Sequence, residues 1–92
     1  MIFRRSNQFK KDLSCLPSEI FIIAKNKFQL FKERPYHPFH PSLRIKPMEG
    51  FPNVYEGHIT KQYVFTFEYF EENGEFVYLF RRIGKHEVYK SP

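Results

Sequence analysis

A proline-rich connector divides the chain into two parts with different apolar periods. Pro35, Pro38 and Pro41 follow one another closely, and each proline fixes its own backbone and disfavours helix at the residue before it. Upstream, apolar residues recur every three or four positions, which is typical of amphipathic helices; downstream, they alternate, which is typical of strands. Because 92 residues are too few for two hydrophobic cores, we expect one domain spanning residues 1–92.

The part before the connector predicts two helices. Ser6 is a suitable N-cap for a first helix whose apolar face carries Phe9, Leu13 and Leu16. A second helix, Ser18–Glu33, begins directly after a proline, a residue suited to a first helical turn. Its apolar stripe is wide enough to cover a sheet. The stripe consists of Ile20, Phe21, Ile23, Ala24, Phe28, Leu30 and Phe31.

The part after the connector predicts an antiparallel sheet, to which a short apolar stretch at the N-terminus adds an opening strand. Asn73 and Gly74 predict a hairpin turn, since this pair supplies the positive φ angles that such turns require. The expected strands are Ile2–Arg4, Leu43–Lys46, Val54–Ile59, Tyr63–Tyr69 and Phe76–Ile83. The expected fold class is α+β, with an N-terminal helical hairpin packed on a small, mainly antiparallel twisted sheet.

Composition limits the function classes. The formal net charge of +5 favours anionic partners, with nucleic acid first and an acidic protein second. The apolar runs are far too short for a membrane helix, and Met1–Arg5 is charged where a secretory signal would be apolar. We therefore expect a cytoplasmic protein without a membrane partner. The only cysteine, Cys15, excludes an internal disulfide and is expected to be a small core residue of the first helix.

The second half gathers residues that can handle protons and phosphates. No zinc-peptidase motif, phosphate-binding glycine loop or nucleophile elbow occurs, and no metal or cofactor is expected. Cleaving RNA by attack of the 2′-OH on the adjacent phosphate requires a base, an acid and a cation, and imidazole and guanidinium groups can fill these roles. The basic set comprises His40, His58, Arg81, Arg82, Lys85 and His86. Of these, His58, Arg82 and His86 are expected to share one concave face of the sheet.

Simpler interpretations of these residues remain open. His40 lies between prolines and is favoured as a surface-loop residue. His58 can be a partly buried histidine satisfied by a carbonyl. Because side chains alternate along a strand, one of Arg81 and Arg82 must point away from the other and be a solvated charge. Tyr89 can pack near the C-terminus or offer a ring on which a base stacks.

Four short motifs cover nearly the whole chain. They are Arg5-Ser6-x-x-Phe9, His40-Pro41-Ser42-Leu43, Tyr55-Glu56-x-His58-Ile59-Thr60 and Arg82-Ile83-Gly84-x-His86-Glu87-x-Tyr89. In this order they resemble the RelE/ParE superfamily of bacterial and archaeal type II toxins. The resemblance implies a RelE-like fold and a metal-independent endonuclease that cleaves messenger RNA, usually on the ribosome, and so inhibits translation. It also implies a cognate acidic antitoxin that holds the toxin inactive.

The resemblance also implies roles for individual residues. Histidines of the YafQ-like branch occupy the positions that His40, His58 and His86 resemble, and an arginine stands where Arg82 does. Tyr89 resembles an orienting or stacking tyrosine of the RelE branch. The implied catalytic set is His58, Arg82, His86 and Tyr89. The implied RNA-binding and phosphate-binding set is His40, Arg44, Lys46, Lys61 and Lys85.

Two departures from the superfamily pattern keep other functions open. Val64 stands where the nucleases commonly have arginine, so that the missing cation would have to come from Lys61, Arg44 or Lys46. The YafQ-like acidic and aromatic pair is replaced by Lys61 and Gln62. A ParE-type toxin, which inhibits DNA gyrase and needs no proton-transfer residue, is the second hypothesis. A catalytically inactive homologue that only binds its antitoxin is the third.

Overall fold

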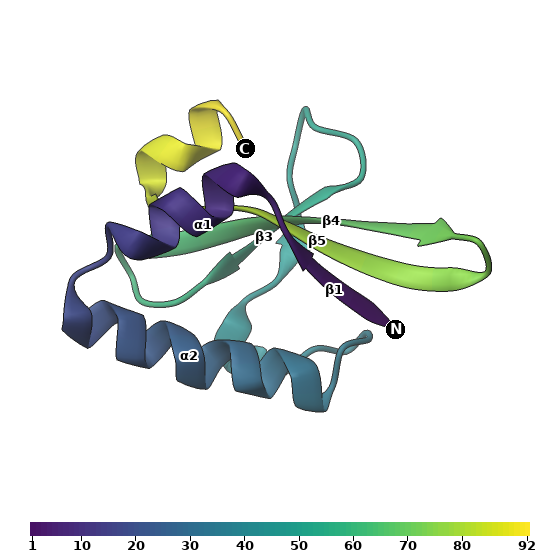
Figure 1. The fold of residues 1–92 in the computed structure, drawn as a ribbon, viewed down its shortest axis with the longest axis horizontal. Helices are drawn as coiled ribbons and strands as arrows, with labels where there is room; N and C mark the ends of the chain where they lie inside the picture. Colours follow the sequence, from purple (N-terminus) through teal and green to yellow (C-terminus); the bar gives the residue numbers. More distant parts are fainter.

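Two helices and a five-stranded sheet make up the computed structural model, which describes residues 1–92 (Figure 1). The helices α1 and α2 come before most of the strands, as the α+β prediction requires. In chain order the elements are β1 (Ile2–Arg5), α1 (Asn7–Ser14), α2 (Ser18–Glu33), the 3-10 helix η1 (Pro41–Leu43), β2 (Lys46–Pro47), β3 (Val54–His58), β4 (Tyr63–Glu72), β5 (Glu75–Lys85) and the 3-10 helix η2 (His86–Lys90).

The sheet has the strand order β1-β5-β4-β3-β2. Strand β1 runs parallel to β5, and the other three pairings are antiparallel. The hairpin between β4 and β5 turns at Asn73 and Gly74, which both have positive φ, as their sequence predicts. The prediction of a mainly antiparallel sheet is therefore confirmed.

Both helices begin where their sequence predicts, and α1 ends at Ser14, before the predicted Leu16. The Ser6 hydroxyl accepts a hydrogen bond from the Phe9 amide at 3.0 Å and caps α1, and α2 covers the predicted residues. Two side chains are less buried than expected. Phe21 is 37% exposed, and Cys15 is exposed at the C-cap of α1, so its prediction as a core residue was wrong. The helix ends one residue before Cys15, which turns that side chain away from the apolar face.

The strand predicted over Leu43–Lys46 was wrong for most of its length. The His40 imidazole accepts a hydrogen bond from the Ser42 amide and initiates η1, and Arg44 adopts a left-handed conformation with φ 50°. Leu43 is buried by this turn. Only the two residues of β2 pair with β3.

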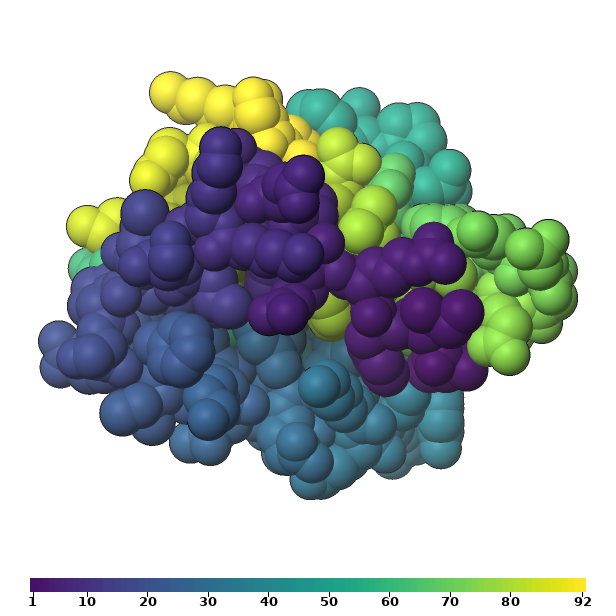
Figure 2. Space-filling view, in the orientation of Figure 1, coloured from purple at the N-terminus to yellow at the C-terminus, as the bar shows by residue number.

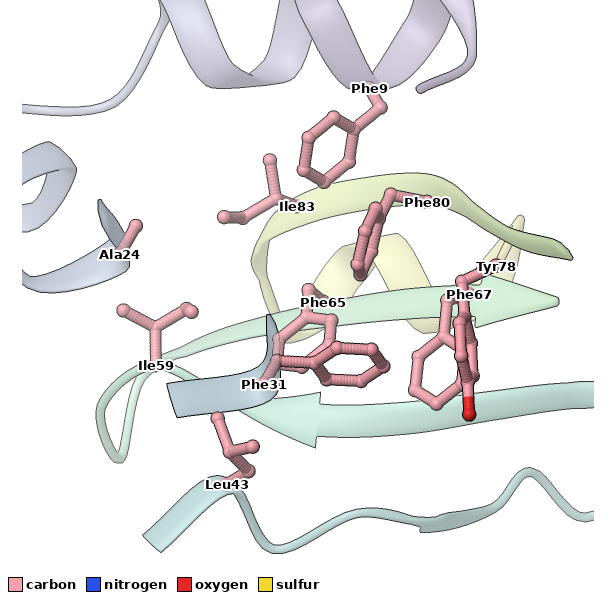
Figure 3. Close-up of a cluster of buried hydrophobic side chains, with 10 residues drawn as sticks. All are labelled: Phe9, Ala24, Phe31, Leu43, Ile59, Phe65, Phe67, Tyr78, Phe80 and Ile83. Carbon is pink, nitrogen blue, oxygen red and sulfur yellow. The ribbon is translucent and has the colours of Figure 1, made fainter. Parts of the chain in front are cut away.

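The hydrophobic core fills the space between α2 and one face of the sheet (Figure 3). Phe31 of α2 makes edge contacts with Phe67 and Phe80 at ring-centroid distances of 5.2 and 5.4 Å. Because side chains alternate along β4, Val64 and Thr66 lie on the opposite face of the sheet. This opposite face carries η2 and the segment up to Pro92, whose main-chain oxygen accepts a hydrogen bond from the Thr66 hydroxyl.

Candidate functional site

Two histidines predicted as catalytic lie next to each other on the sheet face that is turned away from α2. His58 is the last residue of β3 and is opposite Val64 in the register, and His86 is the first residue of η2, directly after β5. Their ring centroids are 6.3 Å apart with an interplanar angle of 69°. His86 Nε2 lies 3.0 Å from the Lys61 carbonyl oxygen in the turn between β3 and β4. Lys61 is exposed.

Tyr89 extends this pair along η2. Its ring is 5.4 Å from the His86 ring, at an interplanar angle of 76°. The Tyr89 hydroxyl is sealed from solvent and makes no hydrogen bond. Burial and the nearby Glu56 carboxylate raise the pKa of the Tyr89 phenol above its ordinary value. The phenol therefore keeps its proton at neutral pH.

Glu56 is a site residue that our sequence analysis missed. It lies two residues before His58 on β3, so both side chains are on the same face of the strand. The Glu56 side chain is only 13% exposed, and Lys46 Nζ lies 3.6 Å from its Oε1 atom. The two-residue spacing from His58 was the signal that could have revealed it.

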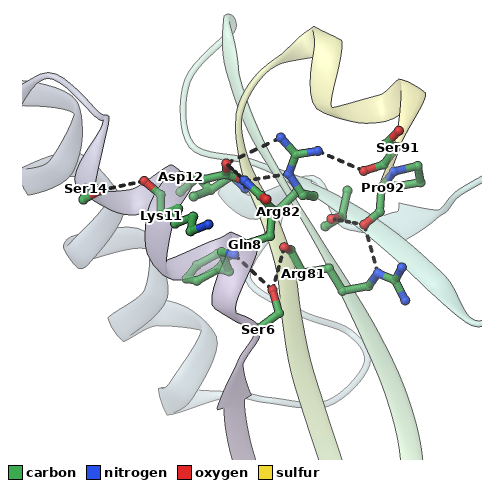
Figure 4. Close-up of polar contacts among 12 residues, drawn as sticks. Ser6, Gln8, Lys11, Asp12, Ser14, Arg81, Arg82, Ser91 and Pro92 are labelled. Atoms are coloured by element: carbon green, nitrogen blue, oxygen red, sulfur yellow. Dashed lines mark hydrogen bonds and ion pairs between the residues drawn. The ribbon is translucent and has the colours of Figure 1, made fainter.

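Arg82 is on the same sheet face by register, but its guanidinium group bonds to α1. Nε donates to Asp12 Oδ2 at 2.7 Å, Nη1 donates to the Ser91 carbonyl at 3.1 Å, and the Ile83 amide donates to the same Asp12 oxygen at 3.1 Å (Figure 4). The side chains of Arg82 and Asp12 are 24% and 11% exposed. The structure therefore brings His58 and His86 together and directs the Arg82 guanidinium to a different set of partners.

These partners also act on the protonation of Asp12. Burial alone would raise the pKa of the Asp12 carboxyl group, but hydrogen bonds from Arg82, Gln8 and the Ile83 amide, together with the Arg82 charge, outweigh burial. The pKa of Asp12 consequently lies below its ordinary value of 3.8. Asp12 is thus a carboxylate at neutral pH and compensates the charge of Arg82.

Three other predicted residues lie outside the histidine pair. His40 is exposed and contacts Ser42. Arg44 is exposed after η1. Lys85 is opposite Tyr63 in the register, and its ammonium group lies 6.0 Å from the centre of that ring. Their proposed contacts with RNA remain predictions.

Val64, the position where an arginine would be expected, is completely buried. Gly84 lies beside it in the register, and a Cβ atom at Gly84 would be only 3.0 Å from Val88 of η2. Packing of η2 on the sheet therefore covers this position.

The chain has no group of three or more His, Cys, Asp or Glu side chains that could hold a metal ion. Neither α-helix has the length and apolar character needed to cross a membrane.

Comparison with known proteins shows the architecture to which this site belongs. No protein-family model and no curated protein sequence matches the chain. Among solved structures, YafQ from E. coli aligns with a TM-score of 0.75 and 15% identity over 94% of this chain and 93% of YafQ. The RelE toxin in the RelB–RelE complex from Methanococcus jannaschii aligns with a TM-score of 0.68 and 21% identity over 99% and 96% of the two chains.

A third solved structure extends the same comparison. The YoeB/ParE toxin from Agrobacterium tumefaciens has a TM-score of 0.72 and 11% identity, over 94% of this chain and 99% of that toxin. YafQ has also been solved in complex with DinJ as a toxin–antitoxin complex. The alignments span nearly the full length of each chain. The chain therefore has the fold of the RelE/ParE toxins.

Proposed function

We propose that the chain is the toxin of a type II toxin–antitoxin system and cleaves messenger RNA without a metal ion. In this proposal it acts in the cytoplasm on ribosome-bound messenger RNA and so inhibits translation. The observation that supports this proposal best is the pairing of His58 and His86 on one sheet face. Two adjacent imidazoles provide the base and the acid that phosphodiester cleavage requires. The RelE/ParE fold and the net charge of +5 agree with it.

The proposed reaction transfers two protons. The 2′-oxygen attacks the adjacent phosphorus, one imidazole takes the 2′-OH proton, and the bond between phosphorus and the 5′-oxygen breaks. A second, protonated imidazole gives its proton to the 5′-oxygen, leaving a 2′,3′-cyclic phosphate. A carbonyl can only accept a hydrogen bond, so the contact of His86 Nε2 with the Lys61 carbonyl requires a proton on Nε2. In the neutral ring Nδ1 is then free to act as the base, and His58 takes the role of the acid.

The developing charge on the phosphate needs a cation, and Arg82 is engaged by Asp12. We propose Lys46 and Lys61 for this role, because Lys46 pairs with Glu56 on the histidine face and the Lys61 carbonyl contacts His86. The Tyr89 hydroxyl is sealed from solvent, so we assign Tyr89 the role of orienting the His86 ring, whose centroid lies 5.4 Å from its own. In this proposal His58, His86 and Tyr89 keep their predicted catalytic roles, and Arg82 stabilises the position of α1.

The test is to incubate the purified chain with translating ribosomes and to map the ends of the message. Replacing His86 or His58 by alanine removes a proton-transfer group, so we expect cleavage to fall by a factor of about 100 or more. His37→Ala is the matched control, because His37 is an exposed histidine in the connector. Circular dichroism should show that all three variants are folded. An intact message with the folded wild-type chain, or full activity in His86→Ala, would contradict the proposal.

A toxin that binds its target without cleaving it is the second candidate. It is favoured by the complete burial of Val64 and by the ion pair that holds Arg82, which leave no free arginine beside the histidines. Inhibition of supercoiling by DNA gyrase, with an intact message, would identify the ParE-type activity. If the chain neither cleaves the message nor inhibits gyrase, the third hypothesis remains, an inactive chain that only binds its antitoxin.

An acidic antitoxin is the expected protein partner in every version of this proposal. The DinJ–YafQ and RelB–RelE complexes support a partner of this kind. The positive charge of the chain would speed association with an acidic protein. Co-purification with the product of a small acidic reading frame next to this gene would test it, and the absence of any complex with that product would count against this assignment.

A further inference from the structure

A hollow lies on the sheet face that carries the histidine pair. It has a volume of about 750 Å³, which is within the range of pockets that hold small ligands. We call it the Phe51 hollow. Its lining includes Phe51, Val54, Leu79, Arg81, Arg82 and Lys90. The loop before β3, strand β5 and the end of the chain thus contribute to one concave surface.

The Phe51 hollow and the histidine pair are at opposite ends of the same row of side chains. Val54, Glu56 and His58 alternate along β3 and therefore share one face. His58 is four positions after Val54 along β3, a distance of about 13 Å at the usual strand rise. The helix η2 connects the same two places, since it begins at His86 and ends at Lys90. Figure 2 shows the chain end (yellow) and the loop near residue 50 (teal) beside the yellow-green β5.

The Phe51 hollow combines an exposed aromatic ring with positive charge. Phe51 is 39% exposed, and the lining contains no Asp or Glu side chain. Arg81 and Arg82 are paired with Glu68 and Asp12 at 2.9 and 2.7 Å. Lys90 is exposed and makes no ion pair, so it is the free cation of the hollow.

Polar contacts join the elements that contribute to the hollow (Figure 4). The Ser6 hydroxyl donates to the Arg81 carbonyl at 2.9 Å, and Arg81 Nε donates to the Pro92 main-chain oxygen at 2.9 Å. These contacts join the start of α1 and the chain end to β5. Phe51 and Lys90, in contrast, have side chains free to meet a ligand.

We propose that the Phe51 hollow binds a nucleotide of single-stranded RNA that flanks the bond held between His58 and His86. Phe51 stacks on the base and Lys90 contacts a phosphate, because exposed rings and unpaired cations together are the usual means of binding single strands. A short stretch of RNA strand bridges the distance between the two places. This inference rests on the proposed function and names a substrate contact that lies outside the histidine pair.

The experiment measures binding of a fluorescein-labelled, single-stranded 2′-O-methyl oligoribonucleotide by fluorescence anisotropy. This probe lacks the 2′-OH and cannot be cleaved. Phe51→Ala should raise Kd about five-fold or more, because a base stacked on an aromatic ring loses that contact. Phe51→Leu keeps an apolar side chain without a ring and should have a similar effect. Phe76→Ala is the control, since Phe76 is 44% exposed at the distant hairpin.

The role of Lys90 is tested by the salt dependence of the same binding. Lys90→Ala should reduce the slope of log Kd against log salt concentration by about 0.7, the value expected for one lost phosphate contact with a single strand. Lys25→Ala removes an exposed charge from α2 and should leave the slope unchanged. Thermal melting should show that each variant is folded. Wild-type affinity in Phe51→Ala would overturn the proposed subsite.

A second measurement separates failure of the subsite from failure of the proposed function. Isotope-labelled wild-type protein is titrated with the same oligonucleotide and followed by NMR chemical shifts. Shifts at both the histidine pair and Phe51 support both proposals. Shifts at His58 and His86 without any at Phe51 or Lys90 overturn the subsite alone. No shift at the histidines contradicts the proposed function itself.

Discussion

Arg82 and Asp12 illustrate how a contact between distant residues decides what a charged side chain does. Arg82 lies four residues before His86, and this spacing indicates a phosphate contact. Its strongest partner, however, is a carboxylate on α1 that also accepts a hydrogen bond from the Ile83 amide. The Asp12 side chain thereby satisfies the backbone of β5 beyond the point where β1 stops pairing with it. No spacing within one segment predicts a contact between residues 12 and 82.

Asp12→Asn should destabilise the chain by about 2 kcal/mol at neutral pH, because hydrogen bonds to a charged group are worth about 1.5–3 kcal/mol. The folded-state pKa of Asp12 is lowered from 3.8. The contribution of its carboxylate to stability is therefore complete above about pH 4 and is lost as pH falls through the lower, folded pKa. Urea denaturation of both proteins at several pH values measures the difference.

The control for this prediction is Glu19→Gln, which removes an exposed carboxylate from the first turn of α2. It should change stability by much less than Asp12→Asn at neutral pH. A difference between wild type and Asp12→Asn that stays constant down to pH 2 would show that the ion pair with Arg82 does not stabilise the fold.

The sequence analysis expected His58 and His86 to lie on one face, and they do, but it did not predict their surroundings. His58 and His86 stood out because imidazoles are rare and suited to proton transfer. Glu56 did not, because an acidic residue in a strand usually faces solvent; here η2 folds back and its Tyr89 lies against Glu56. Burial of Val64 has the same cause, since it depends on where η2 packs.

At the level of elements, local sequence patterns predict the boundaries of helices and turns well. They predict the pairing of strands that are distant in the sequence poorly. The apolar stripe and flanking prolines of α2, and the Asn73–Gly74 turn, were sufficient to predict both elements. The segment before β2 instead follows side-chain hydrogen bonding at His40, which competes with strand pairing. The parallel pairing of β1 with β5 joins the two ends of the chain, so no local pattern could indicate it.

Ser6→Ala tests how firmly α1 is attached to the sheet. Ser6 caps α1 by accepting from the Phe9 amide and also donates to the Arg81 carbonyl. Losing an N-cap of this kind costs about 1 kcal/mol, and the unpaired Arg81 carbonyl adds to it. Amide hydrogen exchange should increase first in α1. Ser14→Ala is the control, because Ser14 is exposed and bonds only to its own helix; an equal loss in both variants would contradict this role.

The two faces of the sheet carry different groups. One face and α2 enclose an aromatic core, and the other face carries the histidine pair, the Phe51 hollow and several lysines. Composition was enough to expect an anionic partner, since net charge is a sum over residues. Which lysines act on that partner depends on the face to which each belongs, and only the folded chain defines that.

Salt dependence distinguishes contacts on this face from the overall positive charge. If Lys46, Lys61 and Lys90 contact three phosphates, the slope of log affinity against log salt for single-stranded RNA should be about −2. Replacing these three by alanine should bring the slope near zero. A second triple variant, Lys10, Lys25 and Lys32 to alanine, lowers the net charge equally from the helical side. It should slow association through weaker long-range attraction while keeping the slope. Equal slopes in the two triple variants would show that RNA is held by net charge alone, and that neither the histidine face nor the Phe51 hollow is its binding surface.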